Sequence, residues 1–107
     1  MSINNSQNAQ MGIELSASMI GSATLIGSLI HNPDIIIFDN QGGASVTISP
    51  DGVNIWRTFP AGEALTLDLR VAQGKAPYYS FPIGTSFFGN GASGTFSISY
   101  IYTKEQQ

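Results

Sequence analysis

Cysteine is absent from this chain of 107 residues, and charge is scarce. Without cysteine, a disulfide scaffold and a cysteine-based zinc site are both excluded. Charged residues make up 10% of the sequence, whereas a typical globular domain carries about 25%. Neutral polar side chains and glycine must therefore cover the surface. The four basic residues are scattered along the chain, so we expect no nucleic-acid partner.

The groups that usually carry catalysis are equally scarce. His31 is the single histidine, and its place beside Asn32 and Pro33 favours a loop-packing role. No serine stands in a Gly-x-Ser-x-Gly motif, and most acidic residues fall at turns or on a solvent-facing side of a strand. Residues 39–40 and 51–54 each hold two oxygen-bearing side chains, but a calcium loop needs more ligands and a final glutamate. We therefore expect no enzymatic activity, no cofactor and no bound metal.

Targeting and membrane segments are also not indicated. Residues 1–10 contain no positive charge, so the following apolar stretch is not framed as a signal peptide. Residues 19–30 are interrupted by glycine, serine and threonine and are too few to span a bilayer. We expect no membrane partner. Because residues 1–10 are mainly Asn, Gln and Ser, we interpret them as a flexible arm or one ordered by a partner.

What the chain does contain is enough apolar mass for one core. Hydrophobic residues make up 42% of the sequence, with thirteen isoleucines and eleven aromatic residues. That composition argues against disorder, and the length suits a single domain. We predict one domain over residues 11–103, followed by a polar tail over residues 104–107.

The apolar residues alternate with polar ones at the period of a β-strand. The alternation is clearest over residues 13–19, 44–48, 64–71 and 94–102. Residues 34–38 instead form a continuous apolar run that suits a strand buried on both faces. Residues 15–30 fit strands but also keep helical spacing, so a helix there stays an alternative.

Turn residues separate these strands. Asp51 and Gly52 predict a tight two-residue turn, with residues 53–59 returning antiparallel, and residues 89–91 predict a hairpin tip. About seven or eight short strands at this spacing are typical of an antiparallel β-sandwich or jelly-roll-like barrel. The predicted fold class is therefore all-β.

Aromatic side chains are the main candidates for a binding surface. Tyrosine and tryptophan are enriched in protein interfaces because they combine large area with a polar tip. We single out Trp56, Tyr78, Tyr79 and Phe81, together with Ile3 in the arm, as interface residues. The alternative use of such rings is stacking on sugars.

Three segments in order carry a family resemblance. They are DGVN at residues 51–54, FPAGEALTLDLR at residues 59–70 and GTFSISYIY at residues 94–102, preceded by the apolar strand DIIIFDN at residues 34–40. Over residues 30–102 the chain resembles small β-sandwich virion proteins of tailed bacteriophages. Each segment is a general β device, and their order is the distinctive feature.

The resemblance implies a non-enzymatic structural protein of the phage particle, made in the host cytoplasm. Proteins of this kind decorate or cement the capsid, and many head decoration proteins are trimers. The implied partners are other copies of the chain and the major capsid protein, or neck and tail proteins. The alternatives are a neck, tail or head-fibre adaptor and a carbohydrate-binding module for attachment to the host surface.

Overall fold

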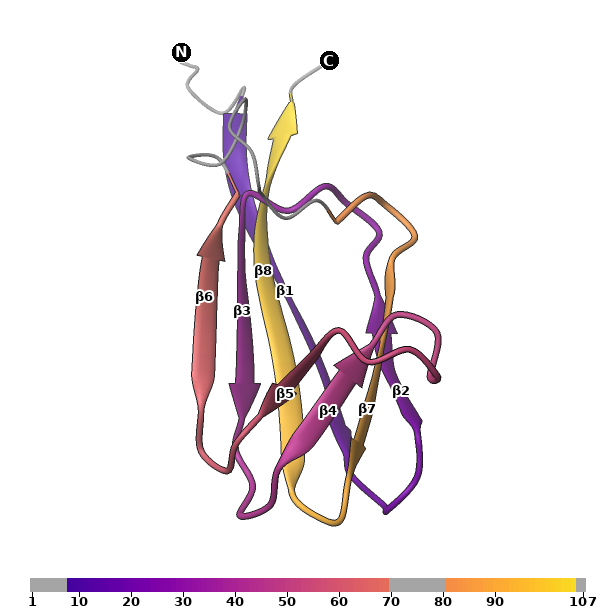
Figure 1. The fold of residues 1–107 in the computed structure, drawn as a ribbon. Helices are drawn as coiled ribbons and strands as arrows, with labels where there is room; N and C mark the ends of the chain where they lie inside the picture. Colours follow the sequence, from indigo (N-terminus) through magenta and orange to yellow (C-terminus); the bar gives the residue numbers. More distant parts are fainter. Residues whose placement is uncertain (1–7, 70–80, 106–107) are drawn as a thin grey trace.

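The computed structural model describes residues 8–69 and 81–105, which form two packed antiparallel sheets (Figure 1). Sheet A has the order β1 (Asn8–Ser18), β8 (Thr95–Glu105), β3 (Ile35–Asn40), β6 (Ala64–Asp68). Sheet B has the order β2 (Thr24–Ser28), β7 (Ser86–Gly91), β4 (Val46–Ser49), β5 (Arg57–Phe59). Eight strands in these two sheets give the strand order of a jelly roll. The predicted antiparallel β-sandwich is confirmed.

The core lies between the sheets and is built by the period-two alternation of the strands. On β3, Ile36 and Phe38 are fully buried, while Ile35 and Ile37 are half-buried on the outer face of sheet A. The continuous apolar run thus supplies one buried face and one half-covered face. Facing side chains from both sheets complete the core, including Ile48, Phe59, Phe87, Phe96, Ile98 and Tyr100.

Residues 15–30 contain strands and loops, and the helical alternative for them is wrong. Strands β1 and β2 occupy that region, because Leu15 and Ala17 pack on the core at strand spacing. Strand β1 begins at Asn8, inside the range assigned to an arm, and pairs with β8 as far as Glu105. The described residues contain no helix, so none of them forms one that could cross a membrane.

The connection between β4 and β5 is a loop rather than the predicted two-residue turn. Strand β4 ends at Ser49 and β5 begins at Arg57. Asp51 has no positive φ, which a type I′ turn requires at both central positions. Its side chain instead accepts the N–H groups of Val53 and Asn54, so these two groups bond within the loop rather than to β4.

The predicted hairpin tip at residues 89–91 lies inside β7. A Cβ on Gly89 would stand 2.9 Å from the sulfur of Met19, and one on Gly91 would stand 2.8 Å from Cγ2 of Val46. These glycines therefore admit core side chains against the strand rather than forming a turn. The turn follows them at residues 92–94, where Gly94 has a φ of +92°.

Candidate interaction surface

The loops gather at two opposite ends of the sandwich. The Trp56 end consists of loops 29–34, 50–56 and 81–85, and the Asn40 end consists of loops 19–23, 41–45, 60–63 and 92–94. At the Trp56 end, Leu29 donates its N–H to the carbonyl of Thr85 (2.9 Å) and accepts from Gly84 (2.8 Å), which joins two of the loops. Distinct surfaces are thus presented at the two ends of one core.

Trp56 and Phe81 meet at the Trp56 end. Their ring centroids lie 5.7 Å apart and the ring planes are nearly perpendicular, at 87°. Both rings also contact the buried Phe38, at 5.1 and 6.1 Å. Each of the two is half-buried, so the pair is anchored on the core while part of it faces outward.

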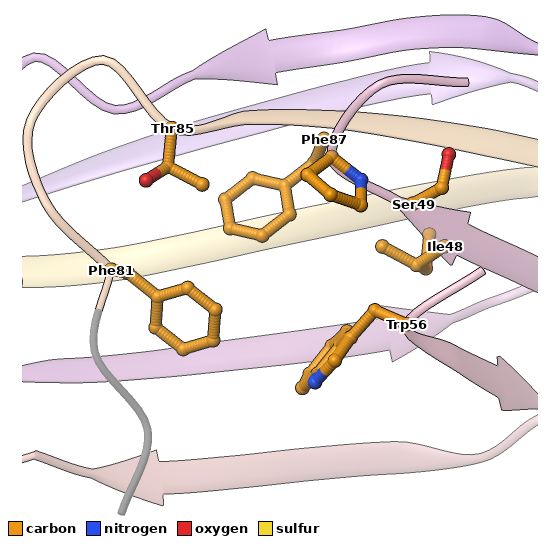
Figure 2. Close-up of a pocket in the computed structure, with 7 residues that line it drawn as sticks. Ile48, Ser49, Trp56, Phe81, Thr85 and Phe87 are labelled. Atoms are coloured by element: carbon orange, nitrogen blue, oxygen red, sulfur yellow. The ribbon is translucent and has the colours of Figure 1, made fainter. Parts of the chain in front are cut away.

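An apolar cavity of about 290 Å³ opens beside this pair. Figure 2 shows the rings of Trp56, Phe81 and Phe87 around the hollow, with Ser49 and Thr85 at its margin. The hydroxyl of Thr85 donates to the carbonyl of Pro82, and Oγ of Ser49 accepts the N–H of Gly52. Because both hydroxyls bond to nearby backbone, the cavity wall is suited to an apolar group.

Large apolar side chains are exposed in the same loops. Ile30, Val53, Ile55 and Ile83 are 63, 79, 62 and 58% exposed. Within the described loops of the Asn40 end, Ile20 is the one comparable side chain, at 69%. Among the described loops, exposed apolar surface is therefore concentrated at the Trp56 end, which is the pattern of an interaction site.

Asp51 sets the shape of the loop that carries Val53. Its carboxylate accepts the N–H groups of Asn54 and Val53, both at 2.8 Å, and the side-chain amide of Asn54, also at 2.8 Å. These donors stabilise the charged form, with the Asn54 N–H contributing most, and they lower the pKa of Asp51 from its ordinary value. The bonds link Asp51 to Val53 and Asn54 across the exposed loop.

His31 supports the same end through stacking. Its ring lies parallel to that of Tyr102, with centroids 3.6 Å apart and planes 5° from parallel. The neighbouring Ile30 donates its N–H to the hydroxyl of Tyr100 at 3.2 Å. His31 thus stands in a loop, as its sequence context predicts, and its ring packs against strand β8.

Of the predicted interface residues, Trp56 and Phe81 are brought together as described. Ile3, Tyr78 and Tyr79 lie outside the described residues. The exposed isoleucines of the Trp56 end were not predicted, although Ile83 stands between Pro82 and Gly84, in a turn. A large apolar residue inside a turn cannot enter the core, and this sequence pattern could have identified the exposed isoleucines.

Comparisons with known proteins assign no family. No family model matches the chain, and no curated protein matches it. A chain from Bacillus endospore appendages, described as a novel family of disulfide-linked pili, aligns over 96% of both chains at 12% identity, with a TM-score of 0.44. A similarity this low supports no inference about function.

Within residues 8–69 and 81–105, no three His, Asp or Glu side chains are grouped as a metal site.

Proposed function

We propose that the protein is a non-enzymatic structural component of a bacteriophage particle, which associates with copies of itself and attaches to the capsid as a decoration or cement protein. The observation that carries the proposal is the apolar Trp56 end, where exposed isoleucines surround an aromatic cavity. A chain in which 10% of the residues are charged has few ions to desolvate when another protein covers it. The phage-like order of segments at residues 34–40, 51–54, 59–70 and 94–102 supports the choice of particle.

Attachment through this end would act by mass action. A protein that binds the assembled capsid and not its separated subunits stabilises the assembly. Covering one exposed isoleucine is worth roughly 1 to 2 kcal/mol per site. A capsid offers many equivalent sites, so weak individual contacts add up over the particle.

The first test locates the protein. Particles released by the genome that encodes the chain would be purified, analysed by mass spectrometry and reconstructed by cryo-electron microscopy. We expect the protein on the head, at many copies. Density at the neck or tail would favour the adaptor alternative, and absence from particles that contain all other structural proteins would overturn the proposal.

The second test asks which end attaches. Ile30→Ser and Ile83→Ser reduce the apolar surface of the Trp56 end, whereas Ile20→Ser makes the same change at the Asn40 end on an equally exposed residue. We expect the first two variants to bind protein-free capsids more weakly and the third to bind as the unchanged protein does. Equal binding by all three would place attachment elsewhere.

The carbohydrate-binding alternative is less well supported by the geometry. Sugar rings stack on exposed aromatic planes, whereas Trp56 and Phe81 stand perpendicular and also pack on Phe38. Binding on a glycan array that is lost in Phe81→Ala would favour this alternative.

A further inference from the structure

The four edges of the two sheets differ in how well they are protected against pairing with another chain. Edge strands β5 and β6 have 3 and 5 residues, and β2 has 5 residues with a register shift between Leu25 and Gly27. Short strands and bulges are the usual protection of a sheet edge. Strand β1 has 11 residues and an unbroken register with β8, and it contains no proline or basic residue. With Glu14 as its one charged residue, β1 is the least protected of the described edge strands.

The direction of one backbone bond shows which residues of β1 face that edge. Met19 donates its N–H to the carbonyl of Gly94 at 2.7 Å, so odd-numbered residues point their backbone groups toward β8. The even-numbered residues therefore point theirs outward, away from β8. Gly12, Glu14 and Ser16 are such residues, and all three are exposed. Among residues 8–69 and 81–105, no strand lies on this outer side of β1 to bond with their outward backbone groups.

One end of β1 extends beyond the body of sheet A. The pairing of β3 with β8 stops at Ile35 and Ile101, whereas β1 and β8 continue together to Asn8 and Glu105 (Figure 1). A two-stranded ribbon alone is only marginally stable in water. A third strand paired with the outer side of β1 would stabilise this extension by making it part of a larger sheet.

We infer that the outer edge of β1 pairs antiparallel with the same edge of a second copy, around a two-fold axis at Ile13. The inference rests on the self-association in the proposed function and names its surface. Eleven residues centred on position 13 pair over their full length only in this register. It sets residues 8–11 of each copy beside residues 15–18 of the other.

The register is chemically self-consistent. Ile13 lies opposite Ile13 of the copy, and Leu15 lies opposite Met11, which is 43% exposed in the single chain. Glu14 is the one charged residue of the strand, and it faces Gly12 of the copy, so no like charges lie directly opposite. Two sheets of four strands become one continuous sheet.

A proline at position 16 tests the backbone bonds. Because the N–H of Ser16 points to the free edge, Ser16→Pro removes no bond of the ladder with β8. It removes two bonds from the symmetric dimer, so we expect dissociation to become roughly ten- to hundredfold easier in sedimentation equilibrium. Ser16→Thr keeps the N–H and is the matched control. Circular dichroism of Ser16→Pro would verify that the sandwich still folds.

A cysteine at position 13 tests the register, since the chain contains no other cysteine. Directly opposite residues without mutual backbone bonds have Cα atoms about 4.5 Å apart, within the range of a disulfide. Ile13→Cys is therefore expected to give a covalent dimer on mild oxidation. Glu14→Cys is more exposed, but its nearest copy lies diagonally, about 7 to 8 Å away, and should cross-link more slowly.

The outcomes separate this inference from the proposed function. Two results would overturn the pairing and leave virion attachment standing. One is that Ser16→Pro dimerises as well as the unchanged protein. The other is that Glu14→Cys cross-links as readily as Ile13→Cys. A β1 dimer in solution with no protein in purified particles would overturn the proposed function and keep the pairing. A monomer at millimolar concentration would overturn the pairing.

Discussion

The two ends of the sandwich differ in how their loops are joined over the core. At the Asn40 end, the buried side-chain amide of Asn40 lies 2.9, 3.0 and 3.0 Å from the carbonyls of Ala44, Phe59 and Pro60, to which it donates. Its oxygen accepts the N–H of Gly42 at 3.1 Å. One side chain thereby joins the loop after β3 to the turn after β5. This end is closed by satisfied polar groups.

The Trp56 end is left apolar instead. Its loops are joined by backbone bonds between Leu29, Gly84 and Thr85, but they expose isoleucines and border a cavity. Among the described loops, a buried side-chain amide joins the loops at the Asn40 end and not at the Trp56 end. Exposed apolar surface, as at the other end, is a usual mark of a protein interaction site.

Removing the amide at the Asn40 end should give the largest effect. Asn40→Ala removes the donor from the buried carbonyl of Phe59 and from the part-buried carbonyls of Ala44 and Pro60. A buried group left without its partner costs about 1 to 3 kcal/mol. We expect the free energy of unfolding to fall by about 3 to 4 kcal/mol in urea denaturation.

Asn90→Ala is the matched control, because Asn90 is an exposed asparagine on β7. A change under about 0.5 kcal/mol is expected there. If the two variants were equally stable, the amide would not close the Asn40 end, and the comparison of the ends would lose its basis.

A pair of glycines sharpens the comparison. Gly94 at the Asn40 end and Gly84 at the Trp56 end have nearly equal φ angles, +92° and +95°. A Cβ on Gly94 would stand 2.5 Å from Cα of Gly42, whereas a Cβ on Gly84 meets nothing within 4 Å. Both alanine variants share the cost of a left-handed backbone, about 1 kcal/mol, and only Gly94→Ala adds a backbone clash.

We therefore expect Gly94→Ala to lower the free energy of unfolding by about 3 kcal/mol and Gly84→Ala by about 1 kcal/mol. Thermal and urea unfolding of both variants measure the difference. Equal losses would mean that the two ends are packed equally loosely at these turns.

The sequence predicts the architecture better than the connections. Alternation at residues 13–19, 64–71 and 94–102 is a property of the strands themselves, and it led to the correct fold class. The turns depend on contacts that the sequence does not display. Gly89 and Gly91 resemble a hairpin tip until Met19 and Val46, distant in the chain, are seen to occupy the space that side chains there would fill.

The candidate site could be predicted only in part, because it too depends on contacts between distant segments of the chain. The sequence predicts Trp56 and Phe81 as interface residues because large aromatic side chains often lie in protein interfaces. Their contact with each other, and the cavity beside them, depends on how loops 50–56 and 81–85 cross the end of the core. The sequence shows Asn40 at the end of the apolar segment 34–40, but its role as a bridge requires the positions of Ala44, Phe59 and Pro60.

The smallest expected effect concerns the loop that presents Val53 at the Trp56 end. Because the N–H groups of Asn54 and Val53 lower the pKa of Asp51, its charge stabilises the folded chain above the ordinary value near about 4. That contribution is lost as the pH falls through the lowered pKa. Asp51→Asn keeps an oxygen acceptor but no charge, so its stability deficit should be constant above about pH 5 and should shrink as the pH falls through the lowered pKa of Asp51. Urea unfolding of both proteins across this range measures the deficit, and a deficit that does not change with pH would show that the carboxylate charge does not hold the loop.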